Sequence, residues 1–346
     1  MLNYENTNIE KVSVHTVGNK TNGEAIHLSK SELNISDQKL RELLIKFFLY
    51  PLKNKEYYSF TSAEDDFTQN PMFNFASHIF DNEKAFHQNS INIASHLYDL
   101  AEHPQIKSGD VFVVYFTGLI VDDEMVNALG IFKSENRHPF LKLDNSTDEF
   151  SMMYEDGINI EKLDKGCLIM DTERSIGFRV CAIDNTNKSS EAQYWNEKFL
   201  QLKPFNDDFY FTKQYMNITK EYVVNELPEE MDRVDKIDLL NRSSEYFKTH
   251  DNFSKKEFEA DVLQEERLIN SFQGYNKRYM QEYDIDLADE FEISPQAVKS
   301  QNRIFKSVLK LDRNFHIYIH GDTGMIRKGV ENDGRKYYKI YFENEA

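Results

Sequence analysis

The chain has 346 residues and a formal net charge of −18, with 40% hydrophobic and 29% charged residues. Its 26 Phe and 19 Tyr supply enough apolar surface for packed cores, which excludes a disordered chain. No run of 18 apolar residues occurs, and no basic stretch followed by an apolar one opens the sequence. We therefore expect a soluble, cytoplasmic protein without a membrane span or signal peptide, and the length favours two domains.

The first expected domain, residues 1–189, has the pattern of an antiparallel sheet covered by helices. A helix is predicted to begin with Ser36 as its N-cap, because Leu40, Leu43, Leu44, Phe47 and Phe48 follow at helical spacing. A second helix is predicted at 83–102. Strands are predicted at 9–16, 111–116, 125–133, 151–160, 166–171 and 175–184.

The second expected domain, residues 190–346, begins where the apolar period changes from 2 to 3.6. Helices are predicted at 191–202, 206–226, 231–249 and 254–272, followed by a helix or turn at 294–310. The chain then ends in three strand-like runs, FHIYIH, MIRKG and YYKIYF. The predicted fold class is α+β: a mostly antiparallel N-terminal sheet with covering helices, then a helical region that ends in a small antiparallel meander.

The sequence carries no recognised catalytic motif. Cys167 and Cys181 both lie in strand patterns, which is typical of small buried apolar residues rather than of a disulfide or metal framework. The acidic runs at 64–66 and 122–124 suit solvated turns better than a metal site, and His316 and His320 lack an evident third ligand. We therefore predict no catalytic residue, no metal site and no cofactor.

One segment stands apart by its charge. Residues 299–339 hold ten basic and four acidic side chains, a surplus of six that leaves −24 for the rest of the chain. The basic residues Lys299, Arg303, Lys306 and Lys310 recur at helical spacing, so we expect them to line one face that suits phosphates. A solvated helix face, or a face that docks on the acidic remainder, explains the same spacing equally well.

The predicted nucleic-acid-binding residues are Lys299, Arg303, Lys306, Lys310, Arg313, Arg327 and Lys328.

A resemblance extends over most of the chain. It is carried by IEKVSVHTVGN with GEAIHLSKSEL, by FVVYF and NALGIFKSE, by SMMYEDGINIEKLDKGCLIMD, by AQYWNEKFLQLKPFNDDFYFTKQYM, and by YDIDLADEFEISPQAVKSQNRIFKSVLKLDRNFHIYIH. These stretches resemble the bacterial nucleoid-associated protein family of the YejK/NdpA type. The resemblance implies a non-enzymatic, cytoplasmic protein of the nucleoid that contacts DNA, takes part in chromosome organisation and forms a homodimer. It also implies partners such as type II topoisomerase subunits.

Three functions follow as hypotheses. The first is a nucleoid-associated protein whose basic C-terminal region contacts DNA non-specifically. The second is a protein-interaction adaptor, in which the acidic remainder binds a basic surface of a DNA-processing machine such as a type II topoisomerase without touching DNA. The third is a metal-dependent nuclease whose carboxylates come together only in the fold.

Overall fold

A computed structural model describes residues 2–52, 56–144, 150–186, 194–228, 231, 233–283, 285–301, 308–311, 315–318, 325–331 and 333–343. Contacts divide the chain into two compact units, Met1–Phe205 and Asn206–Ala346. The domain boundary predicted at 189/190 falls within 187–193, outside the described residues. Within the described part of the chain, no helix has the length and apolarity needed to cross a membrane.

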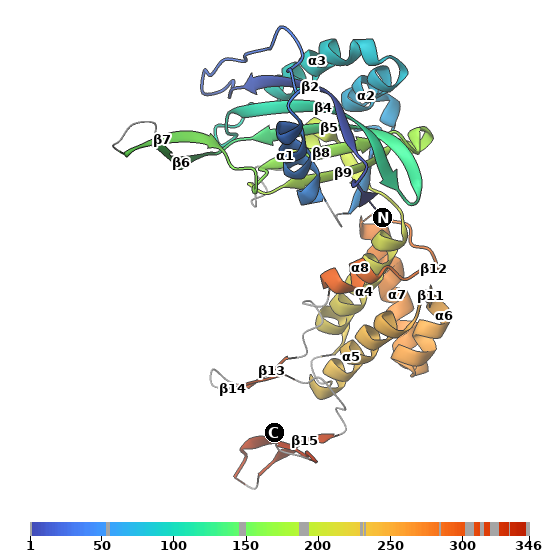
Figure 1. Ribbon diagram of the computed structural model, residues 1–346. Helices are drawn as coiled ribbons and strands as arrows, with labels where there is room; N and C mark the ends of the chain where they lie inside the picture. The colour runs from blue at the N-terminus through green and yellow to red at the C-terminus, as the bar shows by residue number, and fades with distance from the viewer. Residues whose placement is uncertain are drawn as a thin grey trace. The chain divides into compact units, whose positions relative to one another are not determined.

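The first unit contains an eight-stranded antiparallel sheet (Figure 1). Its strand order is β1-β4-β5-β8-β9-β3-β10, and β2 also pairs with β4. The strands are β1 (Leu2–Asn3), β2 (Asn8–Val17), β3 (Tyr57–Phe60), β4 (Gly109–Val121), β5 (Glu124–Ser134), β8 (Lys165–Met170), β9 (Arg179–Asp184) and β10 (Leu202–Pro204). The expected antiparallel sheet is confirmed.

Both faces of this sheet are buried, which explains why β4 has a continuous apolar run rather than an alternating one. Val111, Val113 and Tyr115 belong to one apolar cluster, whereas Phe112, Val114 and Phe116 belong to another. The first cluster includes residues of α2 (Pro71–Asp81), α3 (Phe86–Asp99) and a π-helix (Tyr194–Leu200). The second includes residues of α1 (Gln38–Leu49). The predicted covering helices therefore lie on both faces.

Helix α1 differs from its prediction in two details. Its N-cap is Asp37 rather than Ser36, since the Asp37 carboxylate accepts a hydrogen bond from the Leu40 N–H at 2.8 Å. Leu40 and Leu43 remain 39% and 36% exposed, whereas Phe48 is fully buried. Only the C-terminal half of the predicted apolar stripe therefore reaches the core.

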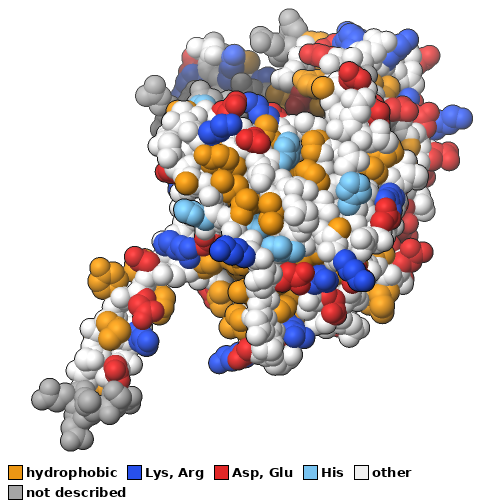
Figure 2. Space-filling view, turned by 90° about the horizontal axis from the view of Figure 1, so that it is seen from above, with side chains coloured by type: hydrophobic (Ala, Val, Ile, Leu, Met, Phe, Trp, Pro, Cys, Tyr) orange, Lys and Arg blue, Asp and Glu red, His pale blue; other side chains and the backbone are white. Residues whose placement is uncertain are grey.

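A two-stranded ribbon, β6 (Arg137–Asp144) and β7 (Ser151–Ile158), extends from the first unit. Its strands pair with each other in eight residue pairs and with none of the sheet's described strands. Figure 2 shows apolar side chains along this arm.

The second unit is mainly helical, and its core is rich in aromatic residues such as Tyr215, Phe253 and Phe258. Its helices are α4 (Asp208–Glu221), a π-helix (Tyr222–Glu226), α5 (Arg233–Thr249), α6 (Lys255–Phe258), a second π-helix (Glu259–Leu263), α7 (Glu266–Tyr283) and α8 (Pro295–Gln301). A short pair joins β11 (Asn252–Ser254) to β12 (Glu290–Glu292). The helical region predicted for this half is confirmed.

Two predicted helices end differently in the structure. The helix expected at 254–272 is interrupted at Gln264, whose φ of 63° is left-handed, and α7 then continues to Tyr283. The helix or turn expected at 294–310 is described only as α8 over Pro295–Gln301 and as β13 from Val308, so Lys310 lies in a strand.

The described C-terminal strands form two separate antiparallel hairpins. The first joins β13 (Val308–Leu311) to β14 (Phe315–Tyr318), and the second joins β15 (Ile326–Val330) to β16 (Lys336–Ile340). The α+β class predicted from the sequence is therefore confirmed, with its C-terminal sheet in the form of hairpins.

Candidate nucleic-acid interface

The β15–β16 hairpin concentrates positive charge on a small structure. Its ten strand residues include Arg327, Lys328, Lys336 and Lys339 and no carboxylate. All four basic residues are exposed. Because neighbouring side chains of a strand point to opposite faces, the pairing register decides which cations lie together.

One face of this hairpin places two cations side by side. Arg327 lies directly opposite Lys339 across the strand pair. The Arg327 Cζ and the Lys339 Nζ lie 5.6 and 4.9 Å from the centroid of the Tyr341 ring. We call Arg327, Lys339 and Tyr341 the open cation face. Like charges directly opposite each other destabilise a strand pair, so the ring compensates only part of this cost.

No described carboxylate forms an ion pair with either cation of the open cation face. In the connecting turn of this hairpin, Arg335 forms an ion pair with Asp333 at 2.7 Å. Among the described residues, this face therefore carries positive charge without a carboxylate counter-charge.

The opposite face anchors the hairpin within the second unit. Ile326 and Tyr338 belong to an apolar cluster with Ile237 of α5 and with Leu311 and Ile317 of the other hairpin. This cluster leaves the open cation face directed away from the apolar contact.

A glycine shapes the open side of the hairpin. A Cβ atom at Gly329 would lie 2.3 Å from the Tyr337 ring, which stands on the same face as Arg327. Glycine at this position thus lets the Tyr337 ring lie flat across the strand pair, beside the cations.

The structure places the predicted binding residues on different elements. Arg327 and Lys328 are exposed on β15, but as neighbours in a strand they lie on opposite faces. Lys299 is exposed on α8, and Lys310 lies in β13 opposite His316. The continuous helical stripe predicted for Lys299 and Lys310 is therefore wrong.

The remaining predicted binding residues, Arg303, Lys306 and Arg313, lie outside the described residues.

Sequence reasoning did not include Lys339 or Tyr341 among the binding residues. A signal for their proximity was present in the sequence. MIRKG and YYKIYF read as two strands joined by a short turn, and such a hairpin brings the start of the first strand next to the end of the second. What the pattern left open was the register, which puts Arg327 opposite Lys339.

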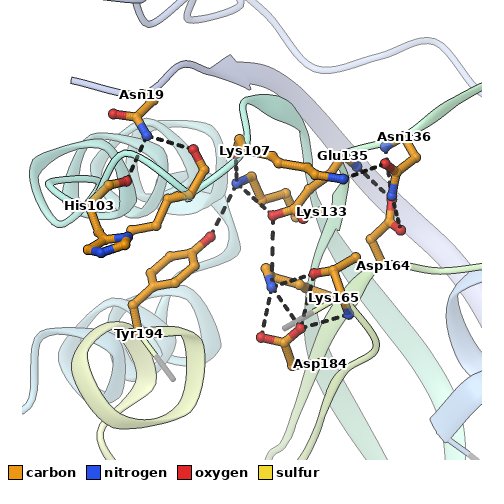
Figure 3. Close-up of polar contacts among 12 residues, drawn as sticks. Asn19, His103, Lys107, Lys133, Glu135, Asn136, Asp164, Lys165, Asp184 and Tyr194 are labelled. Atoms are coloured by element: carbon orange, nitrogen blue, oxygen red, sulfur yellow. Dashed lines mark hydrogen bonds and ion pairs between the residues drawn. The ribbon is translucent and has the colours of Figure 1, made fainter. Parts of the chain in front are cut away.

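A second charged cluster, in the first unit, was not predicted at all (Figure 3). The Lys133 side chain is 1% exposed, and its ammonium donates to the Lys107 carbonyl at 2.5 Å, to Glu135 at 3.0 Å and to the Tyr194 hydroxyl at 3.2 Å. These three partners use all three protons of the ammonium group. We call this cluster the buried charge network.

A second lysine completes the buried charge network. The fully buried Lys165 ammonium donates to both carboxylate oxygens of Asp184 and to the Thr186 hydroxyl, each at 2.7 Å, and lies 3.8 Å from Glu135. Beside it, Asp164 accepts from the backbone N–H groups of Glu135 and Asn136 at 2.7 and 3.0 Å. Each charge of this network already has partners within the fold.

Burial lowers the pKa of Lys133, while the neighbouring Glu135 carboxylate opposes that shift. Burial also raises the pKa of the Tyr194 phenol, so Tyr194 stays neutral as a hydrogen-bond partner. Tyr194 is the first residue of the π-helix, and Lys133 and Lys165 lie on β5 and β8. The network therefore connects this helix to the sheet. The described hydrogen bonds and ion pairs of this network all lie within the fold, so its arrangement serves structure.

One group of residues that could act as metal ligands occurs in the described part of the chain. Single ligand atoms of His250, Glu257 and Asp261 all lie within 4.8 Å of one another, with both carboxylates exposed. The Glu257 carboxylate already accepts a hydrogen bond from the Tyr246 hydroxyl at 3.3 Å. We assign no ion to this group.

The acidic runs considered in the sequence lie in turns. Asp122 and Asp123 form the left-handed turn between β4 and β5, with φ values of 48° and 69°. Asp65 forms an ion pair with Lys203 at 2.7 Å. Neither run belongs to a group of converging metal ligands among the described residues.

The fold and its open cation face define an α+β protein with a small, exposed basic surface on a C-terminal hairpin. Residues 13–336 match the protein family described as nucleoid-associated protein YejK. Because the match covers nearly the whole chain, the protein belongs to this family, as the resemblance had implied. No curated protein matches the sequence.

Proposed function

We propose that this protein associates with the nucleoid and contacts DNA phosphates through the open cation face. The observation that carries the proposal is the apposition of Arg327 and Lys339 without a carboxylate partner among the described residues. A phosphate oxygen between the two cations relieves their repulsion and releases counterions from DNA. Tyr341 holds both cations close to one point, which reduces the ordering cost of binding.

The charge distribution supports local rather than extended contact with DNA. The overall charge of −18 repels a polyanion at long range, so only a region of opposite sign can approach it. Lysine and arginine contacts to phosphates carry no base information, and we therefore propose non-specific binding. The proposed contact set also retains the residues inferred from the sequence: Lys299, Arg303, Lys306, Lys310, Arg313 and Lys328.

Self-association forms part of the proposal. A single hairpin offers few phosphate contacts, whereas a homodimer offers two hairpins to the same duplex and raises the apparent affinity without any new contact. Family membership supports a cytoplasmic, non-enzymatic role in chromosome organisation.

A second candidate function rests on the acidic remainder of the chain. The net charge of −24 outside 299–339 suits a basic protein surface, such as the DNA-facing side of a type II topoisomerase. In this case the protein acts as an adaptor and does not touch DNA itself.

Fluorescence anisotropy of a labelled duplex tests the DNA contact. Wild-type protein is compared with Arg327→Glu/Lys339→Glu and with a control of equal charge change, Lys84→Glu/Lys198→Glu, on exposed lysines of the first unit. We expect the hairpin variant to bind at least about 100-fold more weakly at low salt, and the control to lose much less. Equal loss in both variants, or no binding by the wild type, would overturn the proposal and favour the adaptor.

A further inference from the structure

The β6–β7 ribbon is a two-stranded element without a sheet to support it. Each strand has eight residues, which corresponds to a length of about 26 Å. A two-stranded hairpin alone is marginally stable in water, because most of its side chains cannot bury apolar surface. The ribbon therefore benefits from any surface that covers it.

The pairing register gives the ribbon two different faces. Leu141 lies opposite Tyr154, and Leu143 lies opposite Met152, so these four side chains share one face. We call them the apolar ribbon face. On the other face, Lys142 forms an ion pair with Glu155 at 3.6 Å. That face also carries Phe140 and Met153, which are 48% and 46% exposed, so the apolar ribbon face is the more apolar and the more exposed of the two.

The apolar ribbon face is almost fully exposed. Leu141 and Tyr154 are each 72% exposed, Met152 is 66% exposed and Leu143 is 58% exposed. Four large apolar side chains at this exposure form a patch on the order of 500 Å², the size at which patches on monomers are often functional. Figure 2 shows this arm in profile, with apolar side chains along it.

The charges around the face exclude a partner that binds through charge. The charged side chains on the same face of the ribbon are Arg137 and Asp156, one of each sign. Arg137 also forms an ion pair with Asp110 of β4. DNA needs cations and a basic protein needs carboxylates, and this face provides no surplus of either. An apolar and nearly neutral partner surface fits it best.

We propose that the apolar ribbon face is the surface through which two copies of this chain associate. A second copy carries the same neutral apolar face, and the approach of two such faces avoids the repulsion between molecules of charge −18. Two faces packed on each other remove about 1,000 Å² from water, which reaches the lower limit for a specific interface.

The contact joins faces rather than strand edges. Pro139 in β6 has no amide N–H, which disfavours the addition of a strand along that edge. Face-to-face packing about a twofold axis makes each ribbon cover the other with the same residues, as in an isologous dimer. The interface is small, so we expect dimer formation to depend on protein concentration in the micromolar range.

This inference rests on the self-association included in the proposed function, and it is independent of DNA contact. Sedimentation velocity at a series of concentrations compares wild type with Leu141→Glu/Met152→Glu. Because the twofold axis places each new carboxylate in the interface twice, we expect the dimer dissociation constant to rise at least about 100-fold.

Met153→Glu is the matched control, since Met153 is an exposed methionine of the same ribbon that lies on the other face, opposite Lys142. We expect this variant to dimerise like the wild type. Circular dichroism checks that the variants are folded. We expect them to be, because the substituted positions are exposed. Anisotropy with a labelled duplex at low protein concentration measures DNA contact separately.

Cysteine cross-linking gives a second measurement on folded protein. Both native cysteines are buried, so a cysteine introduced on the surface reacts alone. We expect Leu143→Cys to form a disulfide-linked dimer under mild oxidation and Met153→Cys to form much less. A wild type that stays monomeric at about 100 μM, or a dimer that the Leu141→Glu/Met152→Glu variant leaves intact, would overturn the inference.

Discussion

The two units each hold a pair of cations beside one tyrosine ring, but under opposite conditions. In the first unit, the Lys133 and Lys165 ammonium groups lie 5.8 and 5.4 Å from the centroid of Tyr194. In the second unit, Arg327 and Lys339 lie 5.6 and 4.9 Å from Tyr341. The first pair is buried with Glu135 and Asp184, whereas the second is exposed without a described carboxylate partner.

This difference distinguishes cations that stabilise the fold from cations that are available to bind a ligand. A buried ammonium group must be neutralised and hydrogen-bonded within the fold, because desolvation otherwise costs several kcal/mol. An exposed cation keeps its water and can exchange it for a phosphate oxygen. The same residue types therefore hold the first unit together and, in our proposal, bind DNA in the second.

The largest expected effect is on the stability of the first unit. Glu135→Gln removes the carboxylate that both buried lysines share, and it leaves their positive charges incompletely neutralised. We expect the free energy of unfolding to fall by about 3–5 kcal/mol. Urea denaturation followed by Trp195 fluorescence measures it, because the single tryptophan is fully buried in the first unit.

The matched control for that prediction is Glu155→Gln, which removes a carboxylate from the exposed ion pair with Lys142. We expect a change below about 0.5 kcal/mol. If Glu135→Gln were as mild as this control, the buried charge network would not stabilise the unit.

The pH dependence of stability tests another buried polar group of the first unit, His15. His15 accepts a hydrogen bond from the Ser29 N–H at Nδ1, 3.1 Å away, and its Nε2 lies 3.0 Å from the Ser90 hydroxyl. Burial, followed by the neighbouring His87, lowers the pKa of His15 to about 4. Between pH 6.5 and 4 the unfolded chain therefore binds a proton at His15 that the folded protein does not.

Stability consequently falls as the pH drops through this window, and we expect a loss of about 2 kcal/mol from His15. Urea denaturation at pH 7 and at pH 4.5 measures this loss in the wild type and in His15→Asn. The variant should have a smaller difference between the two pH values. Identical differences would show that His15 does not control this dependence.

The smallest expected effects come from the two tyrosines. Tyr194→Phe removes the hydroxyl that accepts a hydrogen bond from Lys133, and we expect it to lower the free energy of unfolding by about 1.5 kcal/mol. Tyr341→Phe keeps the ring beside the exposed cations and should change stability and DNA affinity very little. Thermal or urea unfolding measures the stability of both variants, and anisotropy measures their DNA affinity. Equal destabilisation by the two substitutions would contradict the contrast between the buried and the exposed cation pair.

The sequence predicted the fold class well because the apolar periods are clear. The run at 111–116 and the hairpin through Asp122 and Asp123 are formed by local residue preferences. The buried charge network was not predictable in this way, since Lys133 and Lys165 become neighbours only when β5 pairs with β8. A lysine at the end of a strand gives no local signal that its ammonium group is buried.

The predicted binding residues show the same limit of local sequence patterns. A helical period through Lys299 and Lys310 was compatible with the spacing, but Lys299 lies in a helix and Lys310 in a strand. A charge pattern alone did not distinguish the two periods. The excess of cations in 299–339 was visible in the sequence, whereas their pairing depends on the register of β15 and β16.

The salt dependence of DNA binding tests the central claim most directly. The dissociation constant for a labelled duplex is measured from about 50 to 200 mM salt for wild type and for Arg327→Gln/Lys339→Gln. If these two cations each neutralise a phosphate, the slope of log K against log salt becomes shallower by about two in the variant. Parallel slopes would contradict the assignment of the open cation face as a DNA-contact surface.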